Sequence, residues 1–160
     1  MHDRIEKLVA RFTDIGEQQI KDLPIYNADL TVEAVGFEHV EEHDFLGVLI
    51  TPWFLNLLLL PCDFKMWRPN QIGHEKIERQ LPSDVHIFTL SGDEIIGEYY
   101  SISLISPMFC FFNQEQARAT ALEHLQHFLT PPAKENTEEM NQPDPQRRRL
   151  LRGFLGRGNA

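Results

Sequence analysis

Cysteine is nearly absent from this 160-residue chain, which has only Cys62 and Cys110. Two cysteines cannot form a disulfide framework, and they do not make a C-x-x-C pair. We therefore expect a protein of the reducing cytoplasm, with a disulfide between the two thiols as the alternative. Both cysteines lie among apolar residues, which is typical of inert core thiols rather than of nucleophiles.

The sequence also lacks the short motifs that mark common enzymes and export signals. It contains no P-loop, no dinucleotide-binding glycine pattern and no G-x-S-x-G. Residues 1–23 alternate charged and apolar residues, without the continuous apolar segment of a secretory signal. These absences favour a cytoplasmic binding protein that has no catalytic residues and no cofactor of its own.

Positive charge is scarce outside the C-terminal end of the chain. There are 24 acidic and 15 basic residues, and five of the arginines follow residue 146, after which no acidic residue occurs. Residues 1–146 therefore carry 10 basic against 24 acidic residues, a net charge of −14, whereas the last fourteen residues carry +5. This acidic body argues against nucleic acid as a ligand and favours basic peptides.

One apolar segment is long enough to raise the question of a membrane span. The eighteen residues from Phe45 to Cys62 contain no charged side chain. Pro52, Asn56 and Pro61 interrupt the segment, and the two halves have the length of strands. We expect two buried strands that meet at a proline kink, and no stable membrane insertion.

The rest of the pattern predicts two helices and further strands. Apolar residues at helical spacing over 3–21 indicate an N-terminal helix that Pro24 ends. Asn113, with Gln116 three residues later, is expected to cap a second helix that runs to about Leu129. The strand-like segments are 30–34, 45–50, 54–60, 76–80, 85–90 and 98–105.

The predicted fold class is therefore α+β, with an antiparallel sheet of five to six strands flanked by an N-terminal and a C-terminal helix. We expect both helices to cover one face of the sheet. Residues 1–130 are predicted to form this single domain. Residues 131–160 are predicted to be flexible, with an acidic, proline-containing linker followed by an arginine-rich tail.

The segment from His39 to His43 reads HVEEH and fits the inverted zincin pattern H-x-x-E-H. That chemistry needs both imidazoles on one face of a helix, one turn apart. Here the motif lies between two strand-like segments, so we expect a solvated hairpin connection. The alternative function is a metal-handling accessory factor that binds nickel or zinc through His39 and His43.

Two proline-containing segments are candidates for a partner-binding surface. Each follows a predicted strand and carries large apolar side chains, which make adaptable contact surfaces. The alternative interpretation is that both segments fill the core. The candidate contact residues are Thr51, Pro52, Trp53 and Phe54 in the first segment and Ser106, Pro107, Met108 and Phe109 in the second.

Taken in order, these segments resemble the HybE/HupJ family of [NiFe]-hydrogenase assembly chaperones. The most specific pieces are ITPWFLN at residues 50–56 and SLISPM at residues 103–108. Gln80-Leu-Pro-Ser and the ending Arg148-Arg-Leu-Leu-Arg-Gly also fit. The resemblance covers about residues 4–130 and the tail. Some relatives carry a fused rubredoxin domain, and we do not expect one here because the sequence has no C-x-x-C pair.

The resemblance implies a cytoplasmic chaperone that matures an exported uptake hydrogenase. Its expected partners, here called clients, are the small-subunit precursor with its twin-arginine signal peptide and/or the large subunit, together with other maturation factors. It would hold them until cofactor insertion is complete. The resemblance brings no catalytic residue with it.

A groove with an apolar floor and an acidic rim would suit a signal peptide, which has a basic and an apolar region. We expect Glu38, Glu41, Glu42 and Asp44 to form that rim beside Trp53. Arg148 and Arg149 in the tail echo the twin-arginine consensus, so we also expect the tail to imitate a client and occupy the groove.

Overall fold

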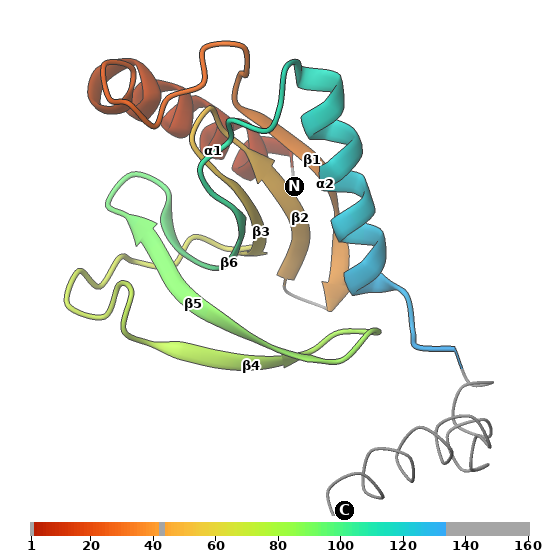
Figure 1. Ribbon diagram of the computed structural model, residues 1–160. Coiled ribbons are helices and arrows are strands. Elements are labelled where there is room, and N and C mark those ends of the chain that lie inside the picture. The colour runs from red at the N-terminus through yellow and green to blue at the C-terminus, as the bar shows by residue number, and fades with distance from the viewer. Residues whose placement is uncertain (1, 42–43, 134–160) are drawn as a thin grey trace, which may run out of the picture. The chain divides into compact units, whose positions relative to one another are not determined.

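A computed structural model describes residues 2–41 and 44–133 and confirms the α+β fold (Figure 1). Six antiparallel strands form one sheet in the order β1-β2-β3-β6-β5-β4. No helix in these two ranges has the length and apolar character needed to cross a membrane. The elements are α1 (His2–Ile15), the π-helix η1 (Gly16–Ile20), β1 (Glu33–Glu41), β2 (Asp44–Ile50), β3 (Leu55–Pro61), β4 (Lys76–Gln80), β5 (Val85–Asp93), β6 (Gly97–Ile105) and α2 (Gln114–Leu129).

The long apolar segment forms β2 and β3, which are buried on both faces of the sheet. Leu46 and Val48 of β2 belong to a core cluster with Leu125 of α2. Phe45 and Leu49, which alternate with them, belong to a second cluster with Leu8 of α1. The expectation that both helices cover one face is therefore wrong. A strand that is apolar on both sides needs a cover on both sides, and each helix supplies one.

A tight hairpin joins β2 to β3 where the sequence suggested a kink. Ile50 is paired with Leu55, so the chain reverses within residues 51–54. The Thr51 N–H donates to the Phe54 carbonyl at 2.8 Å, and the Phe54 N–H donates back to Thr51 Oγ1 at 2.9 Å. The proline therefore lies in a turn between neighbouring strands, a position where its missing N–H is tolerated.

The sheet curls so that β4 approaches β2 although the two strands do not pair. Arg79 of β4 binds Asp44 of β2, with 2.8 Å between Nη2 and Oδ2. The Ser83 N–H, just after β4, donates to the Phe128 carbonyl of α2 at 3.2 Å. Helix α2 runs along β1 and β2 on the inner side of this curl (Figure 1).

Asp93 is the last residue of β5, at the turn of the β5–β6 hairpin, and it connects this hairpin to α1 through Arg11. Its Oδ1 accepts the N–H groups of Ile95 and Ile96, both at 2.9 Å, and its Oδ2 lies 2.7 Å from Arg11 Nε. Burial raises the pKa of Asp93, but the hydrogen bonds from Ile96, Arg11 and Ile95 outweigh it and leave the pKa below its ordinary value.

Because the folded state lowers this pKa, Asp93 stabilises the protein above the unfolded-state pKa of about 3.9. That contribution is lost as the pH falls through the lower folded-state value. We expect Asp93→Asn to reduce the free energy of unfolding by about 1 kcal/mol at pH 7. The effect is modest because the side chains of Arg11 and Asp93 are both partly exposed to water. Urea unfolding should show that the difference in unfolding free energy between the unaltered protein and Asp93→Asn becomes smaller below pH 4. A difference that stays constant down to pH 2.5 would contradict this role.

Candidate binding surface

The structure brings the two proline-containing segments together at one end of the sheet. The Ser106 hydroxyl donates to the Trp53 carbonyl at 3.3 Å. The buried Asn27 binds both segments, because its N–H donates to the Pro52 carbonyl at 2.8 Å and its Nδ2 donates to the Met108 carbonyl at 2.9 Å. We call the surface formed by residues 21–32, 51–54 and 106–113 the end surface.

Asn27 is the residue that holds this surface in place, and sequence reasoning missed it. Besides Met108, its Nδ2 also reaches the Phe111 carbonyl at 3.0 Å, and its Oδ1 accepts the Asp29 N–H at 3.0 Å. Only 9% of the residue is exposed. The two carbonyl groups that accept from Nδ2 lie more than 80 positions further along the chain, so no local pattern indicates them.

Several of the predicted contact residues serve the interior of the protein. Thr51 and Met108 are fully buried, and Pro52 is buried as well. Trp53 and Phe54 are half-buried and pack on Phe12 of α1, with ring centroids 6.4 and 5.6 Å apart. These side chains fix the shape of the end surface and offer a partner little area.

Other apolar side chains on the same loops are open to solvent. Phe112 is 76% exposed and Phe109 is 55% exposed, and both belong to the segment that Asn27 holds. Leu23 and Ile25 are exposed on the loop that carries Asn27 itself. Exposed apolar side chains concentrated on adjoining loops are typical of a protein interaction site. Ser106 and Pro107 are also exposed, as are the acidic residues Asp22, Asp29 and Glu115.

Asp44, one of the residues expected to form an acidic rim beside Trp53, lies at the other end of β2. Asp44 begins β2, and Thr51 follows the last residue of that strand, so six residue steps, roughly 20 Å, separate the two ends. Asp44 is also buried and bound to Arg79. Glu42 lies outside the described residues, as does the side chain of Glu41. The predicted position beside Trp53 is therefore wrong for Asp44.

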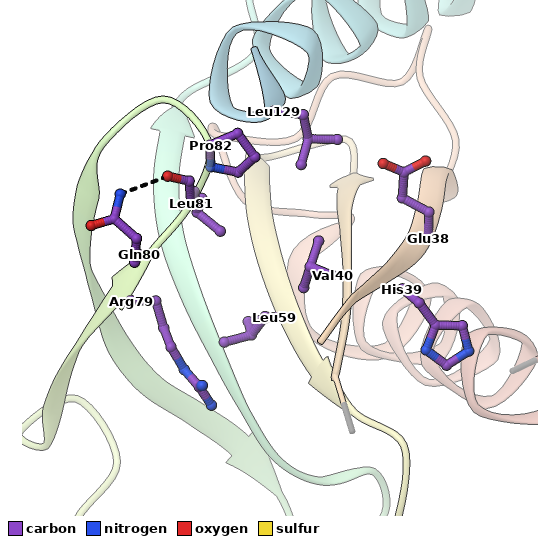
Figure 2. Close-up of a pocket in the computed structure, with 9 residues that line it drawn as sticks. All are labelled: Glu38, His39, Val40, Leu59, Arg79, Gln80, Leu81, Pro82 and Leu129. Carbon is purple, nitrogen blue, oxygen red and sulfur yellow. Dashed lines mark hydrogen bonds between the residues drawn. The ribbon is translucent and has the colours of Figure 1, made fainter. Parts of the chain in front are cut away.

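Glu38 instead lines a pocket of about 250 Å³ between the two outer strands of the curled sheet (Figure 2). Arg79 in this pocket is already bound to Asp44, and much of the remaining lining is apolar. The pocket is lined by Glu38, His39 and Val40 of β1, Leu59 of β3, Leu129 of α2, and Arg79, Gln80, Leu81 and Pro82 at and after the end of β4.

His39 lies within β1, which runs to Glu41, so the prediction of a hairpin connection over residues 39–43 is wrong for residues 39–41. It pairs with Phe45, and its ring centroid is 4.1 Å from that of Phe45. In Figure 2 the ring points away from Leu59 and Leu81. His43 lies outside the described residues. Within residues 2–41 and 44–133, no three His, Cys, Asp or Glu side chains are grouped as metal ligands would be.

The cysteines differ in burial. Cys62 is half-buried and packs against the α1 side of the core, whereas Cys110 is exposed on the end surface, where the sequence predicted a core thiol. The tail arginines Arg148 and Arg149 lie outside the described residues, so their role as a client mimic stays a prediction.

Comparison with known proteins identifies the family. Residues 3–153 match the family described as "[NiFe]-hydrogenase assembly, chaperone, HybE". Over 98% of both chains, the protein is 39% identical to the hydrogenase expression/formation protein HoxT of Azotobacter vinelandii. It is 35% identical to HupJ of Bradyrhizobium diazoefficiens, over 92% of this chain and 86% of that protein.

The fold also matches a solved structure. The solution structure of HybE from Escherichia coli aligns with 81% of this chain and 78% of its own, with a TM-score of 0.62 and 25% identity. The described fold and the matched sequence thus agree over most of the chain. The protein belongs to the HybE family of [NiFe]-hydrogenase assembly chaperones.

Proposed function

We propose that this chaperone binds precursor subunits of an exported [NiFe] uptake hydrogenase in the cytoplasm, through the end surface. The observation that supports this is the group of exposed apolar side chains on loops that Asn27 holds together. Those loops include the central part of ITPWFLN and the end of SLISPM, the two segments that carry the family resemblance. The clients are the small-subunit precursor with its twin-arginine signal peptide and/or the large subunit, and other maturation factors act on the same complex.

The chemistry of the end surface suits a signal peptide. Leu23, Ile25, Phe109 and Phe112 would receive the apolar part of such a peptide, because burying apolar area is the main source of affinity. The exposed acidic residues Asp22, Asp29 and Glu115 would attract its basic start and speed association. Binding alone suffices for this role, so we propose that the chaperone protects its client without chemistry of its own.

The test is an NMR titration with a twin-arginine signal peptide from a hydrogenase small subunit. We expect saturable shifts at residues 51–54 and 106–113. A Phe109→Ser/Phe112→Ser variant should bind about tenfold or more weakly, because large aromatic side chains dominate such contacts. Ile87→Ser is the matched control, since Ile87 is 59% exposed on β5, outside the end surface.

A peptide with both arginines changed to lysine separates the two parts of the interaction. Weaker binding of this control means that the arginine pair is recognised, and equal binding means that the apolar segment alone is recognised. If neither peptide binds, or if Phe109→Ser/Phe112→Ser binds as well as Ile87→Ser, the end surface is not the signal-peptide site.

A further inference from the structure

A second cavity, of about 280 Å³, opens beside the first turns of α1. It lies near the end of β3 that carries Leu60, away from the end surface, which adjoins the other end of that strand. Its walls are apolar side chains from α1, β3, the loop after β3 and the β5–β6 hairpin. Arg4 and Lys7 also line it, which is unexpected in a chain with a net charge of −9.

Arg4 is held in place by only one of its three guanidinium nitrogens. Nη1 donates to the Ile96 carbonyl at 3.1 Å. Nε and Nη2 are buried, and among residues 2–41 and 44–133 neither has a hydrogen-bond partner. Buried donors of this kind are rare, because a group that has lost its water normally gains a protein partner. The two unpartnered nitrogens, Nε and Nη2, are therefore a candidate site for a ligand that accepts hydrogen bonds.

The same pair of nitrogens binds a carboxylate in two other arginines of this structure. Arg118 Nε and Nη2 bind the two carboxylate oxygens of Glu33 at 2.6 and 2.9 Å. Arg68 uses its Nε and Nη2 in the same way on Glu98. This two-pronged geometry matches a carboxylate and is among the strongest hydrogen-bonded arrangements in proteins. Arg4 presents the same pair of nitrogens, and no residue in the described part of the chain binds them.

The charge around Arg4 is not balanced by a direct partner. Burial lowers the pKa of Arg4, while the nearby charge of Asp63 raises it, yet Asp63 makes no hydrogen bond to the guanidinium. Lys7, one turn further along α1, adds a second positive charge to the same cavity. A negatively charged ligand would relieve both charges.

We propose that this cavity binds a carboxylate attached to an apolar body about the size of one amino-acid residue, with Arg4 Nε and Nη2 holding the carboxylate. The volume is below that of sites for drug-sized ligands and suits a single residue. Phe64 covers the guanidinium, with its ring centroid 6.0 Å from Cζ, and is itself 55% exposed. The ligand enters when this ring moves aside.

The probe is N-acetyl-leucine, which carries a carboxylate on an apolar body, and N-acetyl-leucinamide is its uncharged control. A titration followed by ¹H–¹⁵N NMR should give saturable shifts at the Arg4 side chain and the Ile96 amide for the acid only. Arg4→Lys keeps the positive charge but loses the two parallel N–H donors, and it should bind N-acetyl-leucine about tenfold more weakly. Lys7→Gln, at an exposed position, should weaken binding severalfold, whereas Lys76→Gln removes a distant charge and should change nothing.

Two further peptides separate the sources of the carboxylate. A short peptide ending in leucine tests a protein C-terminus, and an amidated peptide with one internal glutamate tests an acidic side chain. Binding of either supports the proposal and identifies the source. The proposal is overturned if the amide binds as well as the acid, if no carboxylate saturates, or if Arg4→Lys and Lys7→Gln both bind like the unaltered protein. None of these outcomes depends on signal-peptide binding at the end surface.

Discussion

Changing Asn27 to aspartate should lower the free energy of unfolding by about 3 kcal/mol at pH 7, although the two side chains have the same shape. In the protein, Asn27 Nδ2 donates to the carbonyl oxygens of Met108 and Phe111. A carboxylate has no donor, so the substitution places a buried negative charge against two carbonyl oxygens. The loops of the end surface would lose the residue that holds them together, and client affinity should fall with stability.

The alanine substitution is the matched control. Asn27→Ala removes the hydrogen bonds without adding a charge, so we expect a smaller loss, about 1–2 kcal/mol. The aspartate penalty should also depend on pH, because burial favours the neutral carboxyl group over the charged one. The part of the penalty that comes from the charge should be absent below about pH 4, where the neutral carboxyl can still donate one of the two hydrogen bonds, and it should grow as the pH rises through the folded-state pKa. Urea unfolding at pH 4 and pH 7 measures this. Equal losses for the two variants at pH 7 would contradict the account.

Gly92→Ala should have an effect of similar size, about 3 kcal/mol, at the opposite side of the domain. The φ angle of Gly92 is +136°, a region that residues with a side chain rarely adopt. A Cβ atom there would overlap the Gly97 carbonyl oxygen and lie 3.0 Å from the Glu98 Cα. Both neighbours are backbone atoms of β6 that pair with β5, so neither can move without breaking the hairpin.

Gly73→Ala separates the two causes of that effect. Gly73 also has a positive φ angle, +80°, but a Cβ atom there would meet no described atom within 4 Å apart from those of Gly73 and its two chain neighbours. We expect a loss of only about 1 kcal/mol, which is the conformational cost alone. Thermal unfolding of both variants makes the comparison. Equal losses at the two positions would show that the backbone contact at Gly92 is unimportant.

Elements with strong local signals could be predicted from the sequence. Strand β4 has the expected bounds, and α2 begins one residue after its predicted cap. Asn113 Oδ1 accepts the Gln116 N–H at 2.9 Å, and Gln116 Oε1 accepts the Phe112 N–H at 2.8 Å. Capping of this kind depends on residues within a few positions of each other, so the sequence pattern predicts it.

Features that depend on distant contacts could not be predicted. A strand was expected from Leu30, but β1 begins at Glu33 because Asn27 holds a turn through Asp29 and Leu30. The faces covered by the two helices, the pocket between β1 and β4 and the unfilled Arg4 nitrogens all follow from tertiary packing. The apolar content of residues 51–54 and 106–109 was visible, whereas the division into buried and exposed side chains was not.

Strands β2 and β3 have a bonded neighbour on each edge and packed side chains on each face. Their amide hydrogens can therefore exchange with solvent only when the whole domain opens, while the loops of the end surface can open locally. Local motion of the exposed side chains on these loops therefore leaves β2 and β3 closed. If the end surface binds clients as proposed, uptake and release require no opening of these two strands.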